Sequence, residues 1–236
     1  MTEKITSKNA VIELLRTDPS RIEKIVIGKG LKGPKIEETV SLCREKKVRY
    51  DFSSEQVRGE TAGITAFVSE YRYARLDEID FGATDCAVVL DGIEDPHNLG
   101  AIARSAAASG CGVLIIPERN SASVTDAAVS ASAGNIFKLK VCRVKNVVQA
   151  LEYLKEKGFW VTGTDMDGRP LFGGYDFTAK AAIVIGSEGK GLRQLVKEKC
   201  DDIVSIELDN GVESLNASVA AALVLFERKR NANRCS

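Results

Sequence analysis

The sequence predicts an α/β fold built around a mostly parallel sheet. From residue 85 onward, six apolar runs alternate with stretches of helical periodicity, and several of these runs are continuous and rich in β-branched residues. Continuous apolar strands are typical of a parallel sheet that helices cover on both faces. The alternation of strand and helix is typical of the same class. A smaller α/β unit precedes this region.

The first part of the chain predicts that smaller unit. Ser7 can cap a helix whose apolar residues follow helical spacing, and Pro34 can start a second helix. Runs rich in β-branched residues mark the strands. The predicted elements are helices over 7–17 and 34–47 and strands over 24–28 and 64–68.

A charged, tyrosine-rich stretch follows the small unit. From Ser69 to about Gly82 it shows no clear period of either helix or strand. We therefore expect two domains, over residues 1–75 and 85–236, which a linker over residues 76–84 connects.

Strands and helices alternate through the second domain. Gly110 and Gly158 follow two helical stretches at the position of a left-handed C-terminal cap. The predicted strands cover 86–90, 112–116, 139–144, 159–163, 182–185 and 202–208, and the predicted helices cover 98–108, 146–157 and 219–226.

Composition limits the classes of function. The 236 residues include 33 Lys and Arg and 33 Asp and Glu, and this balance argues against a protein that coats nucleic acid through its whole surface. Basic residues are nevertheless concentrated in residues 1–49, with twelve Lys and Arg against seven Asp and Glu, and in Arg228–Arg234. The sequence has no apolar run of membrane-spanning length and no signal-peptide pattern at its N-terminus, so we expect a cytoplasmic protein.

The cysteines do not predict a metal site. None of the six belongs to a Cys-x-x-Cys pair, and His97 is the only histidine. Cys86 and Cys111 lie within apolar runs, which is typical of small buried residues in a reducing compartment. We expect the cysteines to be structural.

Three polar segments that contain glycine follow apolar runs, over residues 91–104, 185–192 and 205–218. Because loops that leave the carboxyl ends of neighbouring parallel strands converge, we expect one composite ligand site. The glycine spacing of the second segment matches neither the dinucleotide fingerprint nor the P-loop. A tight strand-to-helix turn would explain that segment equally well by itself.

The polar residues of the first and third segments have both structural and functional interpretations. Asn98 stands where an N-cap is expected for the helix that carries Arg104, and a cap alone would explain it. A lone arginine on a helix is more often solvated or paired. Ser214, Asn216 and Ser218 lie at the start of an apolar helix, where one cap would suffice. Their surplus predicts hydrogen bonds to another group.

These three segments resemble the motifs of the SpoU, or TrmH-type, branch of the SPOUT RNA methyltransferases. The matching residues, in order, are Asp95-Pro-His-Asn-Leu-Gly with Arg104, Ile185-Gly-Ser-Glu-Gly-Lys-Gly-Leu and Ser214-Leu-Asn-Ala-Ser. The N-terminal Ser7-Lys-Asn-Ala-Val, Lys24-Ile-Val-Ile and Gly63-Ile-Thr-Ala-Phe-Val also resemble the L30e-like substrate-binding domain of the family's 23S ribosomal RNA guanosine 2′-O-methyltransferases. Together the two resemblances cover nearly the whole chain.

The resemblance implies methyl transfer from S-adenosylmethionine to a ribose 2′-hydroxyl, by a homodimer whose C-terminal domain contains a trefoil knot. Arg104 would bind the RNA phosphate and orient or deprotonate the hydroxyl, and in a dimer it would reach the cofactor of the other subunit. The implied catalytic positions are Asn98, Arg104, Glu188, Ser214 and Asn216, and the implied cofactor positions are Gly186, Ile206, Leu208, Leu215, Asn216 and Ala217.

Several functions stay open at the level of sequence. A guanosine of 23S ribosomal RNA is the expected target, although Glu60-Thr-Ala-Gly-Ile replaces a turn in which family members often carry His before Gly-Ile. A transfer RNA 2′-O-methyltransferase and an antibiotic-resistance factor that methylates ribosomal RNA share the three loops. A noncatalytic RNA-binding module and a nicotinamide-dependent oxidoreductase are alternatives from other classes, and the glycine spacing disfavours the second.

Overall fold

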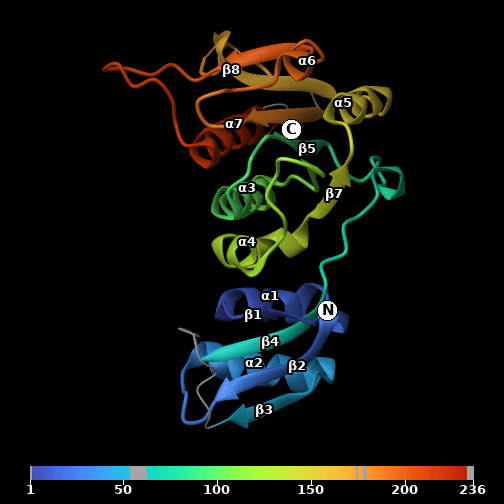
Figure 1. Cartoon of the computed structure of the whole chain (residues 1–236), viewed down its shortest axis with the longest axis vertical. Helices are drawn as coiled ribbons and strands as arrows, with labels where there is room; N and C mark the ends of the chain where they lie inside the picture. The colour runs from blue at the N-terminus through green and yellow to red at the C-terminus, as the bar shows by residue number, and fades with distance from the viewer. Residues whose placement is uncertain (1, 54–62, 174, 178–179, 233–236) are drawn as a thin grey trace.

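A computed structural model of the chain describes residues 2–53, 63–173, 175–177 and 180–232. Two sheets follow one another along the long axis of the molecule, and helices separate them (Figure 1). The smaller sheet has the strand order β1-β4-β2-β3, and the larger sheet has the order β10-β8-β9-β5-β6-β7.

The strands are β1 (Thr2–Ile5), β2 (Ile22–Gly28), β3 (Tyr50–Ser53), β4 (Ile64–Ser69), β5 (Cys86–Asp91), β6 (Val113–Pro117), β7 (Lys140–Val144), β8 (Trp160–Pro170), β9 (Ala181–Gly186) and β10 (Asp202–Ser205). The helices are α1 (Lys8–Thr17), α2 (Pro34–Lys46), α3 (Pro96–Ser109), α4 (Asp126–Ala131), α5 (Val147–Glu156), α6 (Gln194–Lys197) and α7 (Ala217–Ala232). Short 3-10 helices are η1 (Pro19–Arg21), η2 (Leu76–Glu78) and η3 (Asn135–Lys138).

The larger sheet confirms the predicted α/β class. All of its strand pairs are parallel. Every residue of β5 and of β9 is buried. Alternate residues of β5 point to opposite faces of the sheet. Val88 and Leu90 pack in the cluster that contains residues of α3 and α7, whereas Ala87 and Val89 pack with residues of α5. Burial on both faces explains why these runs are continuously apolar.

The smaller sheet contains two strands that the sequence did not predict. β1 pairs with β4 in antiparallel register, and β3 pairs with β2 in parallel register. β3 has no fully buried position, so it lacks the apolar signal of a core strand. Ser7 occupies the N-cap position of α1 as predicted, but its side chain makes no capping hydrogen bond.

Helix α3 begins earlier than predicted, and Asn98 is not its N-cap. Asp95 is the N-cap, and its side-chain Oδ1 accepts a hydrogen bond of 2.9 Å from the backbone amide of His97. Pro96 takes the first helical position, which needs no amide donor. The side chain of Asn98 is therefore available to other loops. Gly110 ends the helix in the predicted left-handed conformation, with φ of 91°.

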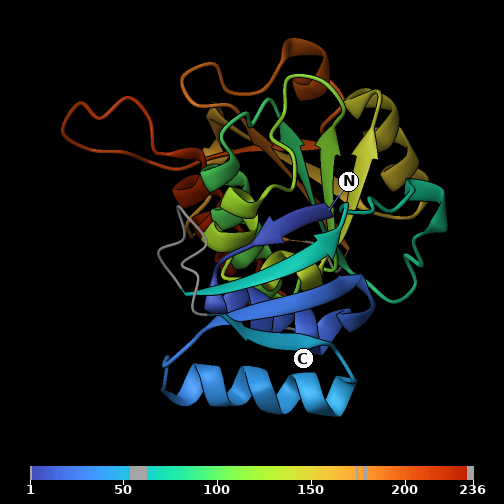
Figure 2. The ribbon, with the colours of Figure 1, turned by 60° about the horizontal axis from the view of Figure 1, so that its bottom comes forward.

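Strand β8 is longer than predicted and β10 is shorter. β10 pairs with β8 first at Thr162 and Gly163 and then, after a register shift, at Arg169 and Pro170. The chain leaves the sheet after Ser205, so the predicted strand residues 206–208 belong to the connection to α7. This connection projects away from the body of the molecule (Figures 1 and 2).

The two sheets are joined by direct packing. Helix α1 lies between the smaller sheet and α4 (Figure 1). The Thr6 amide and hydroxyl donate to the Asp126 carboxylate at 3.2 and 3.1 Å. A Cβ atom on Gly134 would lie only 2.8 Å from the Cα atom of Ala10. Buried apolar residues of both sheets consequently form one continuous cluster.

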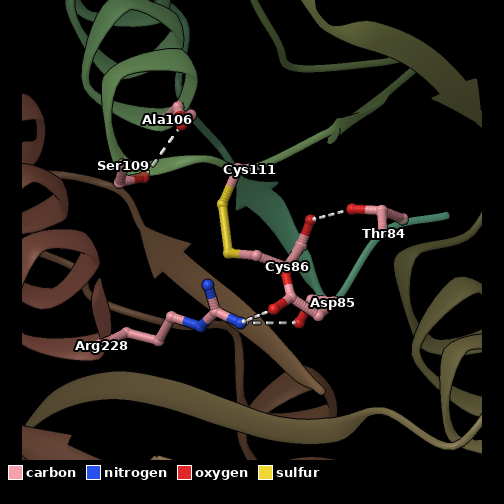
Figure 3. The surroundings of a disulfide bond; sticks show 7 residues. All are labelled: Thr84, Asp85, Cys86, Ala106, Ser109, Cys111 and Arg228. Carbon is pink, nitrogen blue, oxygen red and sulfur yellow. Dashed lines mark hydrogen bonds and ion pairs between the residues drawn. A yellow bond between two sulfur atoms is a disulfide. The ribbon is translucent and has the colours of Figure 1, made fainter. Parts of the chain in front are cut away.

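The expectation of reduced, buried cysteines is wrong for one pair. Cys86 and Cys111 form a disulfide beside the ion pair of Arg228 and Asp85 (Figure 3). The parallel register that places Ala87 opposite Val113 brings these two cysteines, one at the start of β5 and one just before β6, close together. The free cysteines of the described chain are Cys43, Cys142 and Cys200, and Cys235 lies outside the described residues.

Candidate functional site

The candidate site lies at the carboxyl edge of the larger sheet. There β5 leads into the turn before α3, β9 leads into the loop of residues 187–193, and β10 leads into the connection of residues 206–216. These are the three segments that the sequence predicts to converge. Their side chains are joined by hydrogen bonds.

One carboxylate oxygen connects all three segments. Oε1 of Glu188 accepts hydrogen bonds from Nδ2 of Asn98 at 3.1 Å, from Nδ2 of Asn216 at 2.5 Å and from the backbone amide of Ala217 at 3.1 Å. Nδ2 of Asn216 also donates to Oδ1 of Asn98 at 3.0 Å. We call these side chains the Asn98–Glu188–Asn216 cluster.

Asn216 also shapes the start of α7. Its Oδ1 accepts hydrogen bonds from the amide and the hydroxyl of Ser218, at 2.9 and 2.6 Å. The Asn216 side chain thus satisfies a free amide of the helix with its oxygen and joins the cluster with its nitrogen. This arrangement accounts for part of the surplus of polar groups that the sequence shows before α7.

The loop after β9 depends on three glycines. Ser187 and Gly191 exchange two backbone hydrogen bonds, of 3.1 and 3.0 Å. Gly189 and Gly191 have φ values of 73° and 63°, in the left-handed region that favours glycine. A Cβ atom on Gly186 would lie 2.3 Å from the carbonyl carbon of Gly191. The backbone therefore folds back on itself closely enough to exclude any side chain at position 186.

A cavity of about 390 Å³ lies between this loop and the connection of residues 206–216. This volume is within the range of roughly 300–1,000 Å³ that is typical of small-molecule sites. The cavity is lined by five of the six predicted cofactor residues, namely Gly186, Ile206, Leu208, Leu215 and Ala217, together with Glu188 and Ser214. Asn216, the sixth, lies in the hydrogen-bonded cluster instead.

The cavity also has a polar wall that the sequence did not predict. Nζ of Lys197 lies 2.9 Å from Oδ1 of Asp165 and 3.3 Å from Oδ2 of Asp167, and the hydrogen bond with Asp165 raises the pKa of Lys197. All three residues line the cavity. They come from the extended end of β8 and from α6, whose positions the sequence did not indicate.

A buried carboxylate fixes the far end of the same loop. The side chain of Asp91 is fully buried at the end of β5. Its Oδ2 accepts from the backbone amide of Arg193 at 2.9 Å, and its Oδ1 accepts from Nε of Arg193 at 2.6 Å. A buried charge persists only when it is paired and hydrogen-bonded, so Asp91 holds Arg193 in a defined position.

Arg104 and Ser214 lie apart from the cluster. Arg104 is exposed on α3, makes no hydrogen bond or ion pair with another described residue, and does not line the cavity. It follows Asn98 by six residues, which is about 9 Å along the helix axis. Ser214 is exposed at the edge of the cavity. A single chain therefore brings together Asn98, Glu188 and Asn216, but not Arg104.

The chemistry of the cavity suits a ligand that has both a flat apolar part and polar groups. One part of its wall combines aliphatic side chains with glycine backbone that a ligand can approach closely, and another part carries the side chains of Asp165, Asp167 and Lys197. Within the part of the chain that the structure describes, no three His, Cys, Asp or Glu side chains are grouped to hold a metal ion. Among the described helices, none has the length and apolar character needed to span a membrane.

Comparison with known proteins gives the family. Residues 85–226 match the SpoU rRNA Methylase family, and residues 8–74 match the family described as RNA 2′-O ribose methyltransferase substrate binding. YacO of Bacillus subtilis, which is named for the TrmH family of tRNA/rRNA methyltransferases, is 38% identical over 239 residues that cover 96% of each chain. A protein of the same family from Staphylococcus aureus strain MSSA476 is 36% identical, again over 96% of each chain.

Solved structures show the same fold. The SpoU methyltransferase AviRb from Streptomyces viridochromogenes, in complex with the cofactor AdoMet, matches with a TM-score of 0.82 at 24% identity, over 98% of this chain and 90% of that chain. The family match covers more than half of the present chain, and the relatives cover nearly all of it. The chain therefore belongs to the SpoU/TrmH family of S-adenosylmethionine-dependent RNA methyltransferases and has the SPOUT fold.

Proposed function

We propose that the chain methylates a ribose 2′-hydroxyl, on a guanosine of 23S ribosomal RNA. The observation that carries this proposal is the Glu188 carboxylate, which joins the three motif loops beside a cavity lined by the expected cofactor residues. The match of residues 8–74 to a 2′-O ribose methyltransferase substrate-binding family supports an RNA ribose as the acceptor.

The cavity would hold the cofactor through its aliphatic walls and backbone. Ile206, Leu208 and Leu215 would contact the adenosyl part, and Gly186 would allow the closest approach of the backbone. S-adenosylmethionine supplies an electrophilic methyl group when it is bound. The protein's own contribution is then largely positioning, because the acceptor oxygen must be held in line with the bond that breaks.

Arg104 completes the proposed site from a second subunit. In one chain its guanidinium is exposed, without a described partner and away from the cavity. Beside it lies an open groove, which is lined by Ala101 of α3 and by Val219 and Phe226 of α7. The Val219 side chain is 47% exposed and the Phe226 side chain is 48% exposed. A homodimer formed through this face would bury apolar surface and carry Arg104 toward the partner's cavity. There the permanently charged guanidinium would bind an RNA phosphate and orient the 2′-hydroxyl, and Ser214 would contact the ribose.

The domain division is part of the same proposal. Residues 1–75 would bind the RNA substrate, residues 76–84 would act as the linker, and residues 85–236 would carry out methyl transfer in the cytoplasm, where ribosomal RNA is available. The separate family matches and the separate sheets support this division. The trefoil knot stays a prediction. Glu60, Thr61 and Ala62 of the atypical turn lie outside the described residues.

The Arg104→Ala variant tests the proposed activity. We expect methyl transfer to ribosomal RNA from tritiated S-adenosylmethionine to fall about 100-fold or more, the scale seen when one stabilising donor is removed from a reaction centre. Calorimetric affinity for S-adenosylmethionine should stay within threefold of wild type. Lys140→Ala is the control, because the Lys140 side chain is also exposed, forms no hydrogen bond or ion pair with another described residue, and lies outside residues 1–75. Near-normal transfer by Arg104→Ala would contradict the role.

The RNA target is tested in cells. Mapping of 2′-O-methylation with and without the gene should show the loss of one ribosomal guanosine modification. Loss of a transfer RNA modification instead would support the transfer RNA alternative. A wild-type protein that produces no heat with S-adenosylmethionine would support the noncatalytic RNA-binding module.

A further inference from the structure

A second groove lies beside the candidate site, at the carboxyl ends of β6 and β7. It has a volume of about 560 Å³. Its walls come from the residues that follow β6, from the turn between β7 and α5, and from α6 with its flanking residues. We call it the β6–β7 groove. None of the predicted catalytic or cofactor residues lines it.

The β6–β7 groove is cationic. Arg119, Lys145, Arg193 and Lys199 line it, against the single carboxylate of Glu198. Lys199 pairs with Glu152 outside the groove. Arg119 and Lys145 are exposed, and neither makes a hydrogen bond or an ion pair with another described residue. These two cations are therefore available to an anionic ligand.

The remaining walls of the groove are mostly apolar. Pro117, Val147, Val148 and Val196 line it, and Leu195, 68% exposed, adds a further apolar surface. Free cations beside an apolar wall match the two faces of a nucleotide. The phosphate is attracted to Lys and Arg, and the base loses unfavourable contact with water against the apolar side chains.

The groove is continuous with the candidate site. Asn120 and Arg193 line both the β6–β7 groove and a neighbouring cavity of about 560 Å³, and this neighbouring cavity reaches Asn98 and Glu188. Arg193 is held at the junction by the buried Asp91 carboxylate. A chain molecule that occupies the candidate site can therefore extend past Arg193 into the groove.

We propose that the β6–β7 groove binds a single-stranded segment of the RNA substrate next to the nucleotide that is modified. Arg119 and Lys145 contact its phosphates, and the apolar wall receives a base. The inference rests on the proposed function, because it takes the RNA to enter from the Asn98–Glu188–Asn216 cluster. The groove is continuous with the cluster, where the RNA substrate would be modified, and an acidic peptide would not bind at that cluster. This continuity favours a strand of RNA over an acidic peptide as the ligand of the groove.

The test compares two double variants of equal charge change. Arg119→Ala with Lys145→Ala removes the free cations of the groove. Lys140→Ala with Lys157→Ala removes two exposed lysines at the opposite ends of β7 and α5. The probe is a fluorescein-labelled 12-nucleotide oligouridine, and its affinity is measured by fluorescence polarisation between about 50 and about 500 mM salt, an assay range of about one decade.

We expect the groove variant to bind the probe at least about tenfold more weakly than wild type. Its plot of log affinity against log salt should lose a slope of about 1.4, which corresponds to two phosphate contacts in a single strand. The control variant should stay within twofold. A 4-thiouridine version of the probe should crosslink to wild-type peptides that contain residues 118–120 or 145–148.

Equal losses in both variants, or no loss in either, would overturn the proposal. Competition by uridine monophosphate would also overturn it. If the monophosphate displaced the probe at the same concentration per nucleotide as the oligomer, the groove would be a mononucleotide site. Failure of the proposed function is distinguished by separate readouts. Absence of methyl transfer in the wild-type protein would refute the enzymatic proposal, whereas the groove is judged only by probe binding and crosslinking.

Discussion

Replacement of Glu188 by alanine tests whether its carboxylate preorganises the proposed cofactor cavity. The change removes three hydrogen bonds that converge on Oε1, from Asn98, Asn216 and Ala217. A hydrogen bond to a charged group contributes about 1.5–3 kcal/mol when it is protected from water. Glu188 is exposed, so we take about 0.5–1 kcal/mol for each bond, or about 1.5–3 kcal/mol in total.

This loss converts to a weakening of S-adenosylmethionine binding of about 10- to 150-fold, because 1.4 kcal/mol corresponds to a factor of ten. Glu188→Gln keeps an oxygen acceptor and loses the charge. It should therefore weaken binding by a smaller factor, about three- to tenfold, since neutral hydrogen bonds are roughly half as strong as charge-assisted ones.

Isothermal titration calorimetry of both variants with S-adenosylmethionine measures these factors. Glu118→Ala is the matched control, because the Glu118 side chain is exposed and makes no hydrogen bond or ion pair with another described residue. If Glu188→Ala binds S-adenosylmethionine within twofold of wild type, the loops keep their positions without the carboxylate and the reasoning is refuted.

Two further predictions concern the cavity loop and the thiols. Gly186→Ala should weaken S-adenosylmethionine binding by a factor of about 5 to 150, measured by calorimetry, because its Cβ would lie 2.3 Å from the Gly191 backbone and overpacking costs about 1–3 kcal/mol. Unchanged affinity would show that the loop adjusts without cost. Burial raises the pKa of the Cys43 and Cys142 thiols to about 11 and that of Cys200 to about 12. Iodoacetamide at pH 8 should therefore label these three cysteines slowly until urea unfolds the chain. The free energy of unfolding from urea titrations should keep its full value below pH 9 and decline as the pH approaches 11, because only the thiols of the unfolded chain ionise in that range. Rapid labelling of the native protein, or flat stability over that range, would contradict their burial.

The larger sheet was predictable because its physical signal is local and strong. Strands buried on both faces must be apolar at every position, and β5 and β9 show this in the sequence. β3 and the four-residue helix α6 carry no comparable signal, since each buries too few residues to create a period. The extension of β8 depends on its pairing with β10, and the sequence of β8 alone does not indicate this pairing.

The candidate site shows the same division. The convergence of three loops follows from the rule that ligands bind at the carboxyl edge of parallel strands. The sequence pattern does not distinguish Asp95 from Asn98 as the N-cap of α3, because both side chains can accept a hydrogen bond from a helix amide and Pro96 can stand either before the cap or at the first helical position. The contribution of Asp165 and Lys197 depends on the tertiary approach of β8 and α6, so no spacing in the sequence indicates it.

The packing of α1 against α4 and η3 has a consequence for how the protein can be divided. Thr6 is tied to Asp126, Ala10 lies against Gly134, and the apolar residues around them belong to one cluster that extends into both sheets. A fragment that starts at residue 85 would leave part of that cluster exposed to water. The two sheets should therefore melt in a single cooperative transition. If the N-terminal sheet binds RNA as proposed, the shared core fixes the direction in which that sheet faces the candidate site.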